Sequence, residues 1–289
     1  MNLKGAFTAI ITPFNKGRVD LKKFGELIEA QIAAGIDGII PVGTTGESPT
    51  LSMEEHIEVI ETTVKVARQR CLVIAGTGAN STAEAVMLTM AAKKSGADAT
   101  LQVAPYYNKP TQEGLYRHFS EIADEVGLPV VIYNIPGRCG VSIAVETIER
   151  LAKNKLMIGV KEAGGSVERV SAILDACDIS VLSGDDPLTV PMMAVGAKGV
   201  ISVASNIIPA EIKAMVDYAN KGDFASALKM HKKYYPLFRD LFLETNPIPI
   251  KAAMAIKEMI EEEYRLPLCE MSAKNRDSLK KTMKLCGII

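Results

Sequence analysis

The chain has 289 residues, a net charge of −1 and a hydrophobic fraction of 48%, which allows a large core and gives no broad attraction to nucleic acid or anionic membranes. No apolar run approaches the roughly 20 residues that cross a bilayer, and the N-terminus lacks the pattern of a signal peptide. The five cysteines are scattered without a C-x-x-C pair and the three histidines lack metal-ligand spacing, so we expect a cytoplasmic protein with reduced thiols and no metal site.

Short apolar runs recur along the chain, with segments of helical periodicity between them. Most of these runs lack alternation, which is typical of strands buried on both faces of a parallel sheet. We expect strands at 7–11, 38–43, 72–78, 99–105, 130–136, 156–161, 179–184 and 199–205.

The intervening segments carry helix signals. Residues 21–35 place their large apolar side chains on one face and end at Gly35, and Ser52 with Glu55 forms a capping box. Asn80 and Thr111 are the expected N-caps of two further helices. Beyond residue 207 the sequence predicts helices only, at 210–220, 223–243, 247–262 and 272–285.

Eight alternating strand and helix units predict an α/β fold, a (β/α)8 TIM barrel. We assign the catalytic barrel to residues 1–221 and a C-terminal helical extension to residues 222–289. A doubly wound open sheet is the alternative. The unbroken series of eight units and the absence of a G-x-G-x-x-G fingerprint favour the barrel.

Lys161 follows directly on the apolar run 156–160. A lysine at the mouth of an apolar interior loses hydration, which lowers its pKa and leaves a neutral amine that can form a Schiff base with a ketone. A strand-end lysine that points to water is the alternative for this residue taken alone.

Polar residues follow the other predicted strands, and a barrel gathers such strand ends at one rim. The turn at 43–46 can form an anion nest for the carboxylate of a small 2-oxo acid, although an ordinary glycine turn explains it equally well. Tyr133 would lie beside Lys161 and could transfer protons, or be a core aromatic. Arg138 could pair with a second carboxylate, or be a solvated loop arginine.

Together these motifs resemble the dihydrodipicolinate synthase family of pyruvate-dependent class I aldolases. The resemblance runs from about residue 3 to the C-terminus, and its fold agrees with the barrel expected from the pattern. The matching segments are TPF (12–14), GTTGESPTL (43–51), APYYNKPTQEGLYRHF (104–119), YNIPGRCGV (133–141), GVKEAGG (159–165), SGDD (183–186), GVISV (199–203) and NPIPIK (246–251).

The resemblance implies a catalytic role for each of four residues. Lys161 would form the Schiff base with pyruvate, and Tyr133 would be the acid and base for imine formation and cyclisation. Thr44 would link Tyr133 to Tyr107, which in this family reaches in from the neighbouring subunit.

The same resemblance implies the substrate contacts. Thr45 would hold the pyruvate carboxylate, Arg138 would receive the carboxylate of the aldehyde substrate, and Gly184 and Ile201 would line the pocket with main-chain carbonyls.

The implied reaction is that of a lyase. Pyruvate condenses with L-aspartate 4-semialdehyde and the product cyclises, as the first committed step toward diaminopimelate and lysine. No metal or organic cofactor is expected, and the resemblance implies a homotetramer built as a dimer of dimers.

The resemblance also suggests an allosteric site for L-lysine at a subunit interface. A position where the family can carry a second histidine holds Met53 here. The matching residues are Ser48, Pro49, His56, Asn80, Glu84 and Tyr106.

Three alternatives remain at this stage. Within the superfamily, an N-acetylneuraminate or 2-keto-3-deoxygluconate aldolase shares the lysine and the strand tyrosine, but Arg138, Thr44-Thr45 and Tyr107 favour the synthase. A non-catalytic barrel would fit best if Lys161 or Tyr133 were replaced. A phosphate-binding barrel needs a glycine-rich loop after strands 7 and 8, which SGDD and SVAS do not supply.

Overall fold

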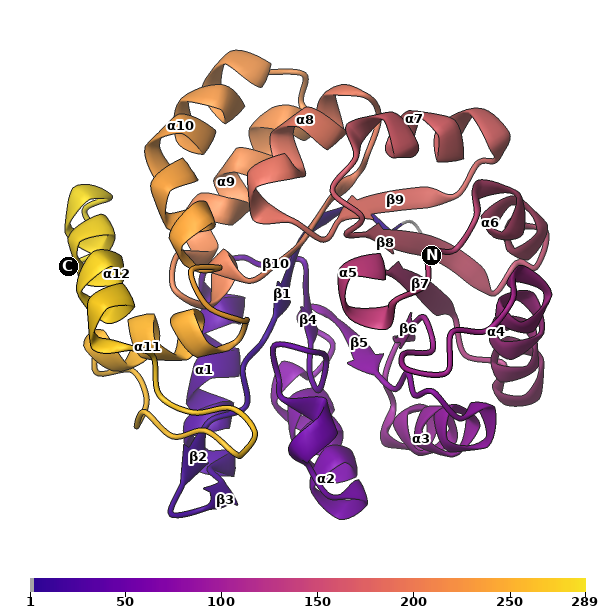
Figure 1. Cartoon of the computed structure of the whole chain (residues 1–289), viewed down its shortest axis with the longest axis horizontal. Coiled ribbons are helices and arrows are strands. Elements are labelled where there is room, and N and C mark those ends of the chain that lie inside the picture. The colour runs from indigo at the N-terminus through magenta and orange to yellow at the C-terminus, as the bar shows by residue number, and fades with distance from the viewer. Residues whose placement is uncertain (1–2) are drawn as a thin grey trace.

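The computed structural model describes residues 3–289, and within them eight parallel strands close into a barrel (Figure 1). Each strand pairs with its neighbour in the chain, and β1 closes the ring by pairing with both β10 and β4. The predicted TIM barrel is therefore confirmed. Its strands are β1 (Gly5–Ala9), β4 (Gly38–Ile40), β5 (Leu72–Gly76), β6 (Ala99–Val103), β7 (Val130–Asn134), β8 (Met157–Glu162), β9 (Ser180–Ser183) and β10 (Gly199–Ser202).

Several strands end before the predicted apolar runs do. In three of those runs a proline, Pro41, Pro105 or Pro136, follows the last strand residue within two positions. Proline has no N–H to donate to the neighbouring strand, so pairing stops there although the hydrophobic pattern continues.

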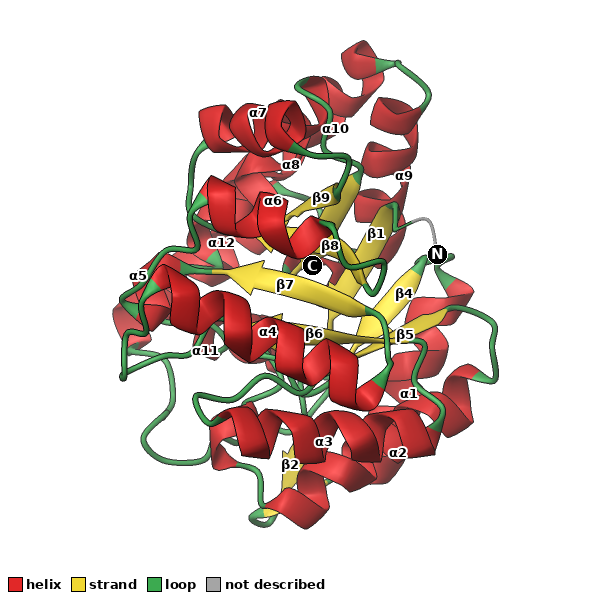
Figure 2. Ribbon diagram, turned by 90° about the vertical axis from the view of Figure 1, so that its right-hand side faces the viewer, coloured by secondary structure: helices red, strands yellow, loops and turns green. Residues whose placement is uncertain are grey.

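Helices surround the barrel and connect its strands (Figures 1 and 2). Figure 2 shows the strands inside this ring of helices. The helices that pack around the barrel are α1 (Leu21–Ala33), α2 (Met53–Ala67), α3 (Thr82–Ser95), α4 (Gln112–Val126), α6 (Val145–Ala152), α7 (Val167–Ala176), α8 (Thr189–Ala194) and α9 (Pro209–Asn220), and a short helix, α5 (Pro136–Cys139), follows β7.

The predicted capping box and one predicted cap are confirmed, and one cap is wrong. Ser52 and Glu55 form the box at the start of α2, and Thr111 caps α4. The cap of α3 is Ser81, whose hydroxyl accepts from the N–H of Glu84. Asn80 instead donates its amide to the backbone oxygen of Tyr106 at 3.3 Å, so its side chain is engaged across the rim.

The C-terminal helices lie against one side of the barrel (Figure 1). They are α10 (Phe224–Asp240), α11 (Ile248–Ile256) and α12 (Ala273–Leu285). α10 packs on α9 and α8, and α12 packs on α10 and α11. α11 ends earlier than predicted because the chain turns at Glu258, whose φ is +58°. The boundary between residues 221 and 222 falls in the short connection between α9 and α10, and the division into a barrel and an extension stays a prediction.

A small hairpin escapes the sequence pattern. β2 (Phe14–Asn15) and β3 (Arg18–Val19) pair antiparallel around Lys16 and Gly17, which have φ values of +52° and +78°. Positive φ at both central positions is the geometry that two-residue hairpins favour. Two-residue strands carry no periodic signal, so this element could not be predicted.

The interior of the barrel is a separate apolar cluster that positions the rim above it. It contains Phe7 and Ile40 together with Tyr133 and Ile201, so the last two side chains face the barrel axis. A Cβ on Gly38 would lie 2.6 Å from the Phe7 ring, so only glycine fits there. In the part of the chain described, no helix is long and apolar enough to cross a membrane.

Candidate active site

Lys161 and Tyr133 stand side by side at the carboxyl ends of β8 and β7, where they are register partners. The Lys161 Nζ lies 4.2 Å from the centroid of the Tyr133 ring. Lys161 is 6% exposed and Tyr133 is 5% exposed, so the amine is held inside the rim rather than in solvent. The solvent-pointing alternative for Lys161 is therefore wrong.

Burial lowers the pKa of Lys161 from 10.5 to about 8. The negative charges of Asp185 and Asp186 oppose this shift, and the positive charge of Arg138 adds to it. An amine with this pKa is partly neutral near physiological pH, which is what attack on a ketone requires.

Gly184 has no side chain, and the space next to it is filled by the side chain of Lys161. A Cβ on Gly184 would lie 3.1 Å from Cε of Lys161 and 2.6 Å from the Ala163 Cβ. The Gly184 N–H also donates to the backbone oxygen of Glu162 at 2.8 Å, which ties the end of β9 to β8. Any side chain at this position would therefore displace the lysine or the strand end.

Tyr133 is held protonated. Burial raises its pKa well above the ordinary value of 10, and the Arg138 charge and a hydrogen bond with the Thr44 side chain only partly oppose that rise. A protonated phenol beside the amine can donate a proton to a departing hydroxyl and recover it later.

The turn from Gly43 to Ser48 is built from successive tight turns. The N–H of Gly46 donates to the Gly43 oxygen and that of Glu47 donates to the Thr44 oxygen, each at 3.1 Å. Among residues 3–289, no acceptor is found for the N–H groups of Thr44 and Thr45. Two neighbouring N–H groups without a partner in the chain are available to a carboxylate.

The C-terminal extension contacts this turn and the neighbouring arginine. Nδ2 of Asn246 donates to Oγ1 of Thr45 at 2.9 Å. The Arg138 guanidinium on α5 donates to the Asn246 oxygen at 2.9 Å and to the Thr245 hydroxyl at 3.3 Å. Arg138 is exposed and lines a cavity of about 200 Å³ with Thr44, where its remaining N–H groups can meet an anion.

Sequence reasoning missed the two carboxyl groups that follow Gly184. Burial raises the pKa of Asp185 to about 6, although the Lys161 charge opposes the rise. The Asp186 carboxylate accepts from the Ser202 hydroxyl at 2.5 Å and from the N–H groups of Val203 and Ala204 at 3.0 Å. Within the matching segment SGDD (183–186), the resemblance implies a role for Gly184 alone.

Comparison with known proteins decides the family. The model of the Dihydrodipicolinate synthetase family matches residues 2–286. The chain belongs to this family. It is 52% identical over 288 residues to the 4-hydroxy-tetrahydrodipicolinate synthase of Thermodesulfovibrio yellowstonii, covering 99% of both chains. It is 54% identical over 289 residues to that of Hydrogenobaculum sp., covering 99% of this chain and 100% of the relative.

Solved structures of similar fold and sequence also belong to this family. The 4-hydroxy-tetrahydrodipicolinate synthase of Methylacidiphilum fumariolicum SolV has a TM-score of 0.98 at 52% identity, covering 99% of this chain and 96% of the other. A chloride-inhibited family member from Acinetobacter baumannii, solved in complex with pyruvate, has a TM-score of 0.97 at 46% identity, with 99% of both chains covered. A family member from Cyanidioschyzon merolae, solved with lysine bound, has a TM-score of 0.96 at 39% identity, again with 99% of both chains covered.

The activity of these relatives is the activity of the chain. It synthesises 4-hydroxy-tetrahydrodipicolinate from pyruvate and aspartate semialdehyde, on the pathway to diaminopimelate and lysine, as a lyase of the class I aldolase type. The other aldolase specificities and the non-catalytic barrel are therefore set aside.

Tyr107 is not brought to the active site of its own chain. The N–H of Asn108 donates to the Tyr106 oxygen at 2.9 Å, and Tyr107 stands at the apex of this γ-turn with a φ of +72°. Its side chain is 90% exposed. The loop therefore projects the phenol outward, away from Thr44 and Tyr133.

Most of the residues predicted to bind lysine line one further cavity of about 160 Å³, namely Ser48, Pro49, His56, Glu84 and Tyr106. Asn80 joins them through its hydrogen bond to the Tyr106 oxygen. The His56 Nε2 lies 2.8 Å from the Gly76 oxygen, and burial lowers the pKa of His56, so this histidine is neutral and held by β5.

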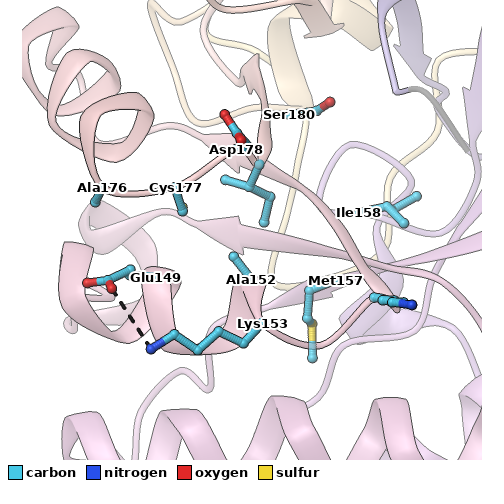
Figure 3. Close-up of a pocket in the computed structure, with 11 residues that line it drawn as sticks. Glu149, Ala152, Lys153, Met157, Ile158, Ala176, Cys177, Asp178 and Ser180 are labelled. Atoms are coloured by element: carbon cyan, nitrogen blue, oxygen red, sulfur yellow. Dashed lines mark ion pairs between the residues drawn. The ribbon is translucent and has the colours of Figure 1, made fainter.

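A larger cavity, of about 490 Å³, lies at the opposite end of the barrel (Figure 3). Met157 and Ser180, which begin β8 and β9, line it together with Glu149 and Lys153, whose charged atoms lie 4.0 Å apart. In this fold, catalysis takes place at the carboxyl ends of the strands, so size alone does not identify the active site.

Proposed function

We propose that Lys161 is the residue that forms the Schiff base with pyruvate. The observation that carries this proposal is the buried amine, with its pKa lowered to about 8, packed against Tyr133 at the carboxyl end of the barrel. The pyruvate complex of the Acinetobacter baumannii relative supports pyruvate as the ligand of this rim.

The proposed reaction asks two things of the protein: one nucleophilic amine, and groups that donate and accept protons. The neutral amine of Lys161 attacks the keto carbon of pyruvate, and Tyr133 donates the proton with which the hydroxyl leaves as water. Loss of a methyl proton from the imine gives an enamine, whose carbon attacks the aldehyde of the semialdehyde. The amino group of that substrate then attacks the imine carbon, closes the ring and releases the lysine amine.

The two carboxylates are recognised separately in this proposal. The N–H groups of the turn and the hydroxyl of Thr45 bind the pyruvate carboxylate. Arg138, which lines the open cavity above, binds the carboxylate of the semialdehyde. The main chain of Gly184 and Ile201 lines the pocket between them.

Borohydride reduction in the presence of pyruvate tests the central step. A reduced pyruvate adduct on the peptide that contains Lys161, read by mass spectrometry, is the expected result. A folded protein that yields no adduct, or an adduct on another lysine, would reject this assignment.

We further propose that the enzyme works as an oligomer of at least two subunits, because Tyr107 is exposed and its proton relay needs a site closed from solvent. The family resemblance extends this proposal to a dimer of dimers. A neighbouring subunit would place Tyr107 beside Thr44, whose side chain lowers the pKa of Tyr133, and so complete a proton relay. The free thiols of the five cysteines in the described residues support a cytoplasmic location.

A Tyr107→Phe enzyme is expected to fold normally and to lose about a hundredfold in kcat, the scale of one positioned proton-transfer group. Mixing it with an inactive Lys161→Ala enzyme should restore activity on subunit exchange, because a hybrid site combines the intact lysine of one protomer with the intact tyrosine of the other. Unchanged activity of the single variant, or no recovery in the mixture, would contradict the relay.

We propose that L-lysine inhibits the enzyme from the cavity that contains Glu84. The lysine-bound structure of the Cyanidioschyzon merolae relative supports the ligand class. Ser48, Pro49 and Tyr106 line both this cavity and the cavity of Arg138, which gives a direct route from one ligand to the other.

Replacing Glu84 by Gln is expected to raise the half-inhibitory lysine concentration about tenfold or more, because the ammonium group of the ligand loses its charged partner. The measurement is the ratio of inhibited to uninhibited rate across a lysine titration, with Glu121→Gln, an exposed glutamate on α4, as the control. Equal titration curves for the two variants would place lysine elsewhere.

A further inference from the structure

A buried ion pair joins the substrate-binding turn to the C-terminal extension. Nζ of Lys251, on α11, lies 2.5 Å from Oε1 of Glu47, and neither side chain is exposed to solvent. Glu47 has a φ of +55° and a ψ of +36°, a left-handed conformation that residues other than glycine rarely adopt. The ion pair joins this turn to α11 across the chain.

The Lys251 ammonium is surrounded by aromatic rings, so the Glu47 carboxylate is needed to balance its charge. Nζ of Lys251 lies 4.3 Å from the centroid of the Phe14 ring and 5.1 Å from that of Tyr264. Among residues 3–289, Glu47 provides the only carboxylate within ion-pair distance of the Lys251 ammonium. The second oxygen of the Glu47 carboxylate accepts from the N–H of Arg265 at 3.4 Å. Removing one partner alone would leave an uncompensated buried charge.

A buried ion pair gains little stability over well-packed apolar side chains, and in some proteins it serves to fix a geometry instead. Here it is one of two adjacent contacts between residues 246–251 and the turn, because Asn246 also donates to the hydroxyl of Thr45. We propose that Glu47 and Lys251 form a positioning pair that holds the turn so that the free N–H groups of Thr44 and Thr45 face the pyruvate carboxylate.

The inference rests on the proposed role of Thr45 in binding pyruvate, and it predicts a characteristic kinetic change. The carboxylate is bound in the same way before and during the reaction, so a displaced turn weakens ground state and transition state alike. Lys161 and Tyr133 are carried by β8 and β7, so the pair acts on them only through the turn. Because Thr44 on this turn also interacts with Tyr133, we expect kcat to fall, but by a smaller factor than the rise in KM for pyruvate.

The test is a Glu47→Gln/Lys251→Met double variant, which removes both charges, keeps the side-chain volumes similar and leaves no unpaired charge. We expect it to fold, and its KM for pyruvate to rise about tenfold or more, with kcat falling by a smaller factor than KM rises. The half-saturating pyruvate concentration in borohydride trapping should rise in parallel. Glu47→Asp keeps the negative charge on a shorter side chain, and we expect it to raise KM for pyruvate several-fold. This variant replaces the double variant in the test if the double variant does not fold.

Asp240→Asn is the matched control. Asp240 is buried in the extension and accepts from the Thr282 hydroxyl at 2.5 Å, between α10 and α12, away from the turn. It should lower the unfolding temperature without changing KM for pyruvate. If Thr45→Val raises KM but the pair variants do not, the pair is only structural and the inference is overturned. If Thr45→Val also leaves KM unchanged, the carboxylate role of Thr45 itself is wrong.

Discussion

A Lys161→Ala enzyme is expected to fold and to form no borohydride-stable adduct with pyruvate. Its turnover should fall by at least about a thousandfold, because the covalent nucleophile is gone and the turn can only bind the substrate. Lys153→Ala, in the cavity at the other end of the barrel, is the control and should trap pyruvate normally. Residual turnover of more than a few per cent in the Lys161 variant would contradict the Schiff-base assignment.

The pH dependence of trapping follows from the same environment. Since burial lowers the pKa of Lys161 to about 8, the neutral amine increases as pH rises through that value, and the trapping rate should level off above it. The Asp185 charge raises the pKa of Lys161 and is present above about pH 6, so Asp185→Asn should move the midpoint to lower pH. A midpoint near 10.5 in the unmodified enzyme would show that the amine is solvated.

An Arg138→Ala enzyme is expected to trap pyruvate on Lys161 but to lose about a hundredfold in kcat/KM for aspartate semialdehyde. That loss corresponds to about 3 kcal/mol, the scale of removing one charged partner from a carboxylate. The variant should also trap pyruvate at slightly higher pH, because the Arg138 charge lowers the pKa of Lys161.

Arg150→Ala is the matched control for this result. Arg150 pairs with Glu113 on the outer surface of the barrel, so its loss should leave both substrates unaffected. If Arg138→Ala keeps full turnover with the semialdehyde, the second carboxylate is bound by other groups, and the assignment of the cavity between Thr44 and Arg138 is wrong.

The barrel could be predicted from the sequence because its strands are apolar runs that are buried on both faces, and their order needs no tertiary information. Lys161, Tyr133 and Arg138 could be predicted as site residues for the same reason, since each lies within or just after such a run. The wrong N-cap at Asn80 has a physical cause: Asn80 and Ser81 are both good caps, and the hydrogen bond to Tyr106 that engages the asparagine comes from another loop.

Residues that act through long-range contacts could not be predicted. Glu47 and Lys251 lie in two motifs that were recognised, yet nothing local shows that a lysine in the apolar segment 248–256 is paired. Asp185 resembles any solvated loop carboxylate until β8 places Lys161 beside it. Sequence patterns therefore do not reveal side chains whose partners lie on distant segments.

The distance along the chain between Glu47 and Lys251, 204 positions, has a consequence for biosynthesis. The turn leaves the ribosome long before the helix that holds it, and β1 must likewise wait for β10 before the barrel can close. A nascent chain thus carries its reactive lysine well before it has a competent site for the keto acid. Premature termination before residue 251 would release a fragment whose turn lacks the support proposed for pyruvate binding.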